Sequence, residues 1–364
     1  MAIRVRAEPL RDLAADIFTA AGCPAEEGAR IARYLVEANL AGHDSHGVIR
    51  VPRYVHWLKQ GYVVPGQTVE VVVDAGALAV VDGRYGFGQT VGEQAVDLGL
   101  DKARAHGVSV IGLRNSGHLG RVGDWPERAA ACGFASVHFV NTTGLGMLVA
   151  PFGGRERRMS TNPFAVGVPA GDGPPVILDF ATSIVAEGKI LVAINGGKPL
   201  PRDAFVDADG SFTTDPEVIY GKLDGTQPLD ARTGAGAIRA MGEHKGSGLS
   251  IMCELLGGAL TGGGCARPGE TRIVNGMLSI YIDPARLDAA GSFAGEVARY
   301  LDFARSAKPI EADGTVMMPG DPETAHRAER ARAGIPLQDS TWTSICETAR
   351  ALGVDPEVAA AAAQ

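Results

Sequence analysis

A histidine stands where a strand-like run gives way to a helix, in the segment Val108 to Asp124, VSVIGLRNSGHLGRVGD. Glycines 117, 120 and 123 surround His118 and predict a turn whose exposed backbone N–H groups attract phosphate or carboxylate. Because unperturbed imidazole titrates near pH 6.5, His118 is a candidate general acid and base. A histidine in such a turn can equally cap the helix or bond a turn carbonyl. The G-x-G-x-x-G spacing of the Rossmann fingerprint is absent here.

The segment GHDSHGVIRVPR, residues 42–53, concentrates side chains that could bind a ligand. His43, Asp44 and His46 are possible metal ligands, but three ligands within four residues converge poorly and no helical H-x-x-x-H completes the set. Arg50 could instead hold a carboxylate through two parallel hydrogen bonds. The third interpretation is a solvated turn followed by a surface arginine. The residues alone leave these three alternatives open.

Three further stretches carry small polar or charged groups. Residues 160–163 (STNP) and 179–183 (DFATS) lie at the edges of apolar runs, where they could bond ribose hydroxyls or phosphates, or simply form turns and N-caps. Residues 243–248 (EHKGSG) open a helix predicted over 245–260. Cations at a helix N-terminus oppose the helix dipole, which favours a bound anion nearby. Glu254, in that helix, could orient one of these cations or pair with an arginine.

Hydrophobic periodicity divides the chain into helical ends and a mixed middle. Helical spacing covers the first 60 residues and returns from about residue 293. Strand-like runs between them predict strands at 69–73, 78–81, 108–113, 135–140, 164–168, 176–178 and 276–282, with a helix over 90–106 and a mostly loop segment at 196–236. We therefore expect an α/β (α+β) protein, with a helical domain formed by residues 1–72 and 290–364 and a central domain formed by residues 73–289.

Composition excludes several classes of function. The net charge of −8 comes without a basic stripe, so nucleic acid is not an expected partner. No apolar run approaches the roughly 20 residues of a membrane span, and the N-terminus lacks a signal-peptide pattern. The five cysteines form no C-x-x-C pair, which indicates reduced thiols. The sequence thus predicts a cytoplasmic protein with no membrane partner, in which a few placed cations bind any anionic ligand.

Taken in order, six stretches resemble the malate/L-lactate/sulfolactate dehydrogenase family, a non-Rossmann group of NAD(P)-dependent oxidoreductases. They are AGHDSHGVIRVPRYV, NSGHLGRVGDW, STNPFAVGVP, LDFATSIVAEGK, EHKGSGLSIMCELLGGALTGG and the tail PGDPE…RAGIPL, which together span about residues 35–350. The GHDSHG turn, the EHKG start and the tail DSTWTSICETARALG most resemble the hydroxycarboxylate dehydrogenase B type. The resemblance implies a homodimer with an α-helical domain and a cofactor domain built on a mixed, largely antiparallel sheet.

The resemblance also implies roles for individual residues. His118 would exchange a proton with the substrate oxygen, assisted by His46, and Arg50, Ser45 and Asn162 would bind the substrate. NAD or NADP would be bound by His46, Gly120, Arg121, Val122, Ser160, Ile177, Leu178, Asp179, Phe180, Ala181, His244, Asn275, Pro322, Glu323, Thr324 and Ala325. Lys189 and Lys245 match motif positions without an assigned role. Ser247 departs from the family pattern, because many relatives carry an aromatic residue there.

The function expected from these residues is hydride transfer between NAD(P)H and a small 2-oxo acid or 2-hydroxy acid, without a metal. A cyclic imino-acid reductase of the same family is an alternative, because its substrate also carries a carboxylate beside the reacting double bond. Two alternatives from other classes are a metal-dependent hydrolase that uses His43, Asp44 and His46, and a nucleotide-binding protein without catalysis.

Overall fold

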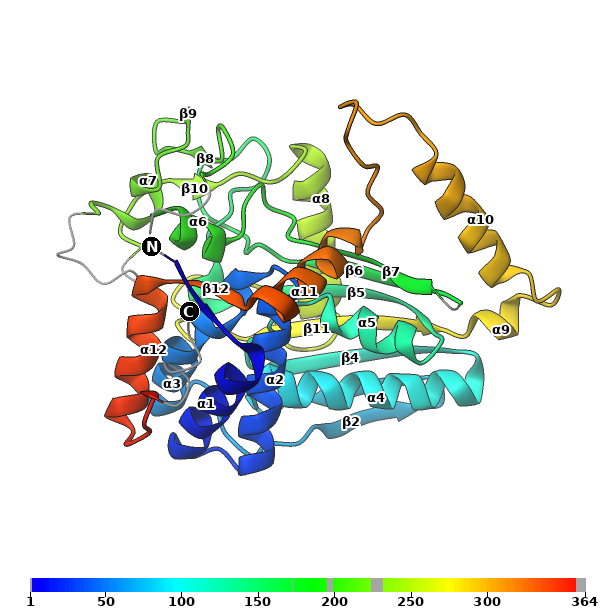
Figure 1. Ribbon diagram of the computed structural model, residues 1–364, viewed down its shortest axis with the longest axis horizontal. Helices are drawn as coiled ribbons and strands as arrows, with labels where there is room; N and C mark the ends of the chain where they lie inside the picture. The colour runs from blue at the N-terminus through cyan, green and yellow to red at the C-terminus, as the bar shows by residue number, and fades with distance from the viewer. Residues whose placement is uncertain (1, 172, 195–198, 224–231, 358–364) are drawn as a thin grey trace.

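A seven-stranded sheet forms the centre of the molecule (Figure 1). The computed structural model describes residues 2–171, 173–194, 199–223 and 232–357. In spatial order the strands are β2 (Glu70–Ala75), β3 (Leu78–Asp82), β4 (Val108–Ser116), β11 (Asn275–Ile282), β5 (Ala135–Thr142), β6 (Phe164–Ala170) and β7 (Gly173–Phe180). β3 and β4 pair in parallel, and the other five neighbouring pairs are antiparallel. The predicted α/β class with a mixed, largely antiparallel sheet is therefore confirmed.

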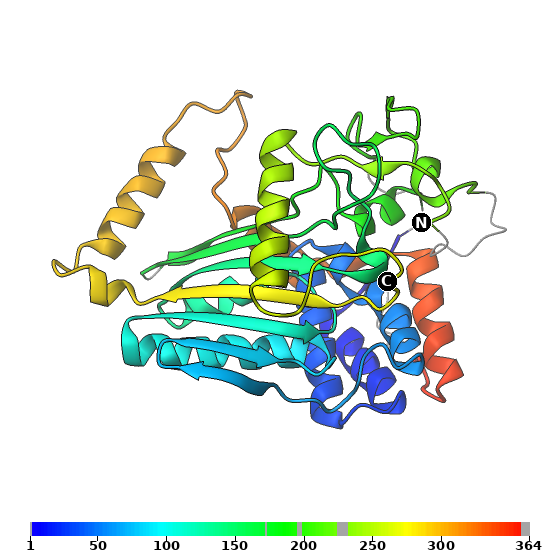
Figure 2. The same cartoon turned by 180° about the vertical axis from the view of Figure 1, so that it is seen from behind.

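Helices cover both faces of this sheet (Figures 1 and 2). α4 (Gly88–His106) and α5 (Asp124–Ala131) lie on one face, and α8 (His244–Cys253) lies on the other. The close approach of α4 requires glycine at position 99, since a Cβ there would lie 2.3 Å from the ring of buried Tyr281. After α8 the chain continues as a π-helix, Glu254–Ala259. This wider turn changes which side chains face the sheet, and Leu260, which follows it, is 63% exposed.

The two ends of the chain share one hydrophobic core. It is built from α1 (Ala7–Ala20), α2 (Ala25–Leu40), α3 (Val51–Lys59) and α12 (Asp339–Ala351), with Ile17, Phe18, Leu35 and Ile345 among its buried side chains. β1 (Ala2–Val5) pairs antiparallel with β12 (Ile335–Gln338) and joins the two ends directly. This pair of strands was not predicted from the sequence, because four residues are too few to establish a period of two.

A separate buried cluster, called the third core below, includes residues of 196–236, the segment expected to be mostly loop. It contains α6 (Glu187–Ile194), α7 (Glu217–Tyr220) and a small sheet of β8 (Phe205–Val206), β9 (Phe212–Thr213) and β10 (Ala237–Ile238). Phe205, Ile219 and Ile238 are buried in it. Residues 195–198 and 224–231 of that loop lie outside the described residues. Each of these strands has only two residues, which is too short for an alternation that a sequence pattern could detect.

After β11 the chain leaves the sheet and then returns. α9 (Pro284–Leu287) and α10 (Phe293–Arg305) stand apart from the main body, and α11 (Asp321–Ala333) returns to lie beside α2 (Figures 1 and 2). The boundaries expected for the two domains stay a prediction. Among the described residues, no helix is long and apolar enough to cross a membrane.

Candidate active site

The loop that carries His118 is held in place by its backbone. β4 ends at Ser116, and the N–H of Gly117 donates to the Gly86 carbonyl. The N–H of Leu119 donates to Oδ1 of buried Asn275 at 2.9 Å. A Cβ at Gly88 would lie 2.2 Å from the His118 carbonyl oxygen, so glycine lets the start of α4 approach the loop. The position of His118 is therefore fixed from β11 and from α4.

A buried tyrosine orients the His118 ring. The Tyr54 hydroxyl lies 2.6 Å from His118 Nδ1, and Gln89 Nε2 donates to the same hydroxyl at 3.3 Å. The Gly120 nitrogen lies 3.3 Å from Nδ1. For Nε2 to act as a base, the ring proton must be on Nδ1, which then donates to the Tyr54 oxygen. Burial raises the pKa of Tyr54 to about 12, which keeps its hydroxyl protonated. Nε2 of His118 is consequently the nitrogen left for a substrate.

His46 and Arg50 reach the same place from the end of α2. Two short 3₁₀ turns, Asp44–His46 and Val48–Arg50, follow that helix. The His46 ring lies parallel to the His118 ring, with an interplanar angle of 4° and centroids 5.7 Å apart. Arg50 is only 8% exposed, and its Nε donates to the Ser45 carbonyl at 2.7 Å. This bond sets the direction of the guanidinium. Among the described residues no hydrogen bond of its two terminal nitrogens is found, so they can bind a carboxylate.

Both histidines are neutral over a wide pH range. Burial lowers the pKa of His118 well below its usual value, and the positive charges of Arg50 and Arg53 lower it further. Burial and the Arg50 charge likewise lower the pKa of His46, with a further contribution from His118. The unperturbed value near 6.5, expected from the sequence, therefore does not apply to His118, because its ring lies in a partly buried site beside two guanidinium groups.

One small cavity, called the inner cavity below, collects most of the predicted reactive residues. His46, Arg50, His118 and Ser160 line it, together with Trp57. Ser45 lies directly beside it, with Oγ 3.0 Å from His46 Nδ1. An ionisable imidazole, a buried guanidinium and a buried hydroxyl therefore converge on one volume, as general acid/base chemistry on an anionic substrate requires.

The predicted cofactor residues of three separate segments form a second group. The Gly123 N–H donates to Asp179 Oδ2 at 2.8 Å, which ties the loop after His118 to the end of β7. The Ile177 N–H donates to the Pro319 carbonyl at 3.2 Å, which brings the start of α11 beside the same strand. Gly120 adopts a φ of 73°, a conformation that favours glycine. The segments that carry residues 120–122, 177–181 and 322–325 therefore lie next to one another.

Buried ion pairs fix this second group. The Arg121 side chain is fully buried and bonds Asp124 Oδ1 and Glu127 Oε1, both at 2.8 Å. Arg327 of α11 bonds the other oxygen of Glu127 at 2.7 Å. The Arg121 side chain therefore has a structural role here, and its backbone is the part that can face a ligand.

Two predicted residues do not join either group. Asn162 is completely buried, and its Nδ2 donates to Glu254 Oε2 at 2.7 Å while its Oδ1 accepts from the Thr142 N–H at 3.1 Å. Glu254 thus bonds an asparagine rather than the cation or arginine expected. His244 is exposed at the start of α8, where its ring contacts Phe152 at 5.9 Å. The ligand roles of Asn162 and His244 stay predictions.

The residues of the hydrolase alternative are bound to other partners. His43 Nε2 lies 2.9 Å from Glu323 Oε1. Both oxygens of Asp44 accept from Arg330, at 2.6 and 3.0 Å. In the part of the chain that the structure describes, no group of three or more His, Cys, Asp or Glu side chains is arranged to hold a metal. The geometry therefore disfavours a metal centre built from His43, Asp44 and His46.

Sequence reasoning missed three residues of the site. Neither Tyr54 nor Gln89 was given a role in the site, although the i, i+4 spacing of Arg50 and Tyr54 places both on one side of a helix. Glu187 lines the inner cavity and accepts from Arg232 Nε at 2.7 Å. Nothing in the local sequence marks Glu187, because its partner lies 45 residues away.

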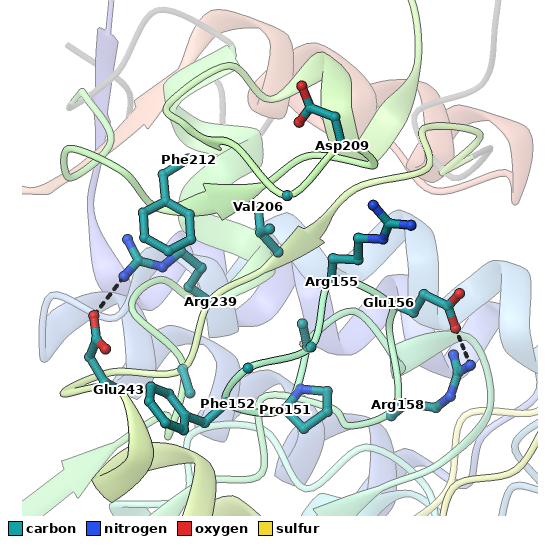
Figure 3. A pocket seen from close by; sticks show the side chains of 15 residues that line it. Pro151, Phe152, Arg155, Glu156, Arg158, Val206, Asp209, Phe212, Arg239 and Glu243 are labelled. Carbon is teal, nitrogen blue, oxygen red and sulfur yellow. Dashed lines mark hydrogen bonds and ion pairs between the residues drawn. The ribbon is translucent and has the colours of Figure 1, made fainter.

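A cleft larger than the inner cavity lies beside the third core, and none of the predicted site residues lines it (Figure 3). It has a volume of about 660 Å³. Arg239 pairs with Glu243 at 3.0 Å and lies over the Phe212 ring, and Arg158 pairs with Glu156. Since these charges are compensated and no histidine lines the cleft, the inner cavity is the better candidate for chemistry.

Comparisons with known proteins agree with this assignment. Residues 5–346 match the family model described as malate/L-lactate dehydrogenase. Hydroxycarboxylate dehydrogenase B from Escherichia coli O157:H7 is 38% identical over 97% of this chain and 96% of its own length. L-lactate dehydrogenase from Cupriavidus necator is 35% identical over 94% and 96%. The solved structure of a candidate malate/lactate dehydrogenase from E. coli aligns with a TM-score of 0.90, at 37% identity, over 99% of this chain and 98% of that one. The chain therefore belongs to the malate/L-lactate dehydrogenase family and is an oxidoreductase of that family.

Proposed function

We propose that this protein transfers a hydride between NAD or NADP and a small 2-oxo acid or 2-hydroxy acid, with His118 as the general acid and base. The main support is that the ring of His118 and the guanidinium of Arg50 line one cavity, and that Nδ1 of His118 is hydrogen-bonded to Tyr54. An imidazole and a guanidinium side by side suit a substrate that has a reacting oxygen next to a carboxylate.

The donor set fits a nicotinamide cofactor. At the edge of the inner cavity the rings of His46 and Trp57 and the hydroxyl of Ser160 offer flat faces and a hydrogen-bonding group, which suit a planar amide-bearing ring lying against the cavity. The backbone from Gly120 to Val122 and the first turn of α11 offer N–H groups of the kind that bind phosphates. A bound nicotinamide supplies or takes up the hydride. The residues named here would hold the cofactor beside the substrate.

Arg50 and His118 divide the remaining work. Arg50 binds the substrate carboxylate and so orients the adjacent carbon, an effect on positioning that removes much of the entropy cost of reaction. In the oxidative direction neutral His118 accepts the hydroxyl proton at Nε2. In the reductive direction protonated His118 returns a proton to the developing alkoxide, which typically accelerates such a step about 10²- to 10⁴-fold. Tyr54 keeps Nε2 directed at the substrate.

The lowered pKa of His118 predicts opposite pH profiles in the two directions. Because its pKa lies well below 6.5, His118 is already neutral at neutral pH. We expect kcat/KM for oxidation to stay level as pH falls from about 8 to 6.5 and to decrease only below that, whereas kcat/KM for reduction should rise steadily as pH falls. Substrate carboxylate beside Arg50 cancels one of the charges that lowers the pKa, so kcat should report a higher pKa than kcat/KM. Profiles in both directions test this, and a reductive plateau extending above pH 7 would contradict it.

Tyr54→Phe should separate orientation of His118 from binding. Phenylalanine keeps the ring but loses the 2.6 Å bond to Nδ1, and a hydrogen bond of about 1.4 kcal/mol corresponds to a tenfold change. We expect kcat to fall about tenfold with little change in the KM of either substrate. Tyr300→Phe, on exposed α10, is the matched control and should change neither constant. An unaltered kcat in Tyr54→Phe would remove the orienting role of the hydroxyl.

The direct experiment is an assay of a panel of 2-oxo acids with NADH and with NADPH, including a cyclic imine and a chelator. Reduction of a 2-oxo acid that persists with chelator supports the proposal and identifies the cofactor. Reduction of only the imine would favour the imino-acid reductase. Activity abolished by chelator and restored by zinc would favour a metal-dependent enzyme, and binding without turnover a non-catalytic nucleotide-binding protein.

We also propose that the protein is a cytoplasmic homodimer. An exposed apolar face on α8 and the π-helix, made of Ile251, Met252, Leu255 and Leu260, supports a contact with a second copy. Sedimentation analysis tests the dimer, and a monomer at micromolar concentration would overturn it.

The five cysteines are all unpaired, which suits the reducing cytoplasm.

A further inference from the structure

A second pocket adjoins the inner cavity on the other side of the two arginines. Arg50, Arg53 and Gly188 line both volumes, so the two are contiguous. The second volume, called the outer pocket below, measures about 350 Å³, against about 60 Å³ for the inner cavity. Ligand sites commonly begin near 300 Å³, so the outer pocket is large enough for a substantial part of a small molecule.

Three elements from distant parts of the chain build the outer pocket. Ile49 and Pro52, from the second 3₁₀ turn and the adjoining start of α3, and Leu191 of α6 form an apolar wall. Ser340, Thr341 and Ser344, at i, i+1 and i+4 spacing, direct one side of α12 to it. The site thus combines an apolar passage with a group of hydroxyls.

The position of Arg50 decides what can enter. A 2-oxo acid bound with its carboxylate on Arg50 and its reacting oxygen at His118 must send its third substituent elsewhere. The inner cavity has little room for more than the reacting group, and the outer pocket begins at Arg50 itself. The side chain of the substrate is the part that fits there.

The lining also indicates the chemistry of that side chain. The described residues that line the outer pocket include arginine, histidine and hydroxyl donors but no carboxylate. A substrate side chain with an apolar stem and a hydrogen-bond acceptor at its far end would therefore contact the apolar wall with its stem and accept from the hydroxyls with its end. We infer that the outer pocket holds the side chain of an extended 2-oxo acid, of five carbons or more, that ends in a hydrogen-bond acceptor.

This inference rests on the proposed function, and its test uses substrates of graded length. Pyruvate, 2-oxobutyrate and 2-oxopentanoate differ by one methylene each, and burial of each methylene should raise kcat/KM about fourfold. 2-Oxoglutarate and 5-methyl-2-oxohexanoate match in shape but differ in the terminal acceptor, so 2-oxoglutarate should exceed its partner about tenfold. A series in which pyruvate is the best substrate would overturn the inference and leave the proposed function intact.

A filling substitution tests the place of binding. Ser344→Leu adds bulk to the outer pocket, and it should lower the ratio of kcat/KM for 2-oxoglutarate to that for pyruvate at least tenfold. Thr343→Leu is the matched control, because Thr343 is exposed on the same helix and does not line the pocket. It should leave the ratio and the activity unchanged. An equal ratio in both variants would place the side chain elsewhere, and a chain that reduces no 2-oxo acid would overturn both proposals.

Discussion

His118→Asn should fold, bind the cofactor and lose most of its turnover. Asparagine can retain a hydrogen bond to the Tyr54 hydroxyl, and the loop is held by the backbone bonds of Gly117 and Leu119, which the substitution leaves in place. The substitution removes the imidazole of the loop between β4 and α5. We expect kcat to fall by about two to four orders of magnitude, the usual span for a lost general acid or base.

The pH profile distinguishes loss of the acid and base from simple damage. The wild type should show an ionisation below pH 6.5, in line with the lowered pKa of His118, and the variant should lack it. His106→Asn, at the exposed end of α4, is the control and should match the wild type. Unfolding of His118→Asn would support a structural role for the histidine. A folded variant with near-normal kcat would make His46, whose ring lies parallel to it, the next candidate.

The sequence predicted the elements that have a strong local pattern. All seven strands of the central sheet were expected, with ends that differ by a few residues, and the helix expected at 90–106 is α4. The pairs that the sequence could not predict are those between distant segments. β1 with β12 joins residues more than 300 apart, and β11 inserts between β4 and β5, which precede it by more than 100 residues. Order in space depends on packing, which a single sequence does not display.

The reactive residues of the site were predicted from sequence motifs, but the pKa values of its histidines were not. His118, Arg50 and His46 were identified from types, spacing and family resemblance, and the structure places them in one cavity. The pKa of His118 depends on its burial and on Arg53, which approaches it from a helix more than 60 residues away. Asn162 also lies in a matching motif and was predicted to bind the substrate, but its side chain donates a hydrogen bond to Glu254 within the protein. A motif indicates position along the chain, and the contacts of the side chain decide its role.

Arg50→Lys should raise the KM of the 2-oxo acid far more than it changes cofactor affinity. Lysine keeps the charge but loses the planar pair of donors and the bond from Nε to the Ser45 carbonyl that directs the guanidinium. Hydrogen bonds to a charged group contribute about 1.5–3 kcal/mol, so we expect KM to rise about 10- to 100-fold. Steady-state kinetics with each substrate varied in turn measures this, and an unchanged KM would place Arg50 outside the substrate site.

The substrate itself provides the sharpest control for Arg50. Replacing the carboxylate by an amide, as in pyruvamide, removes the charge that Arg50 is proposed to bind. If the Arg50 guanidinium contacts the substrate carboxylate, the wild type should prefer pyruvate over pyruvamide strongly and Arg50→Lys should prefer it only weakly. The losses in kcat/KM caused by Arg50→Lys and by the amide should then be less than additive when the two are combined. Because the side chain of Arg50 is almost fully buried, the charge has little solvent to screen it, which makes the coupling large enough to measure. Additive effects of the two changes would show that the carboxylate is bound by another group, with Arg53, which lines the same cavity, the first to examine.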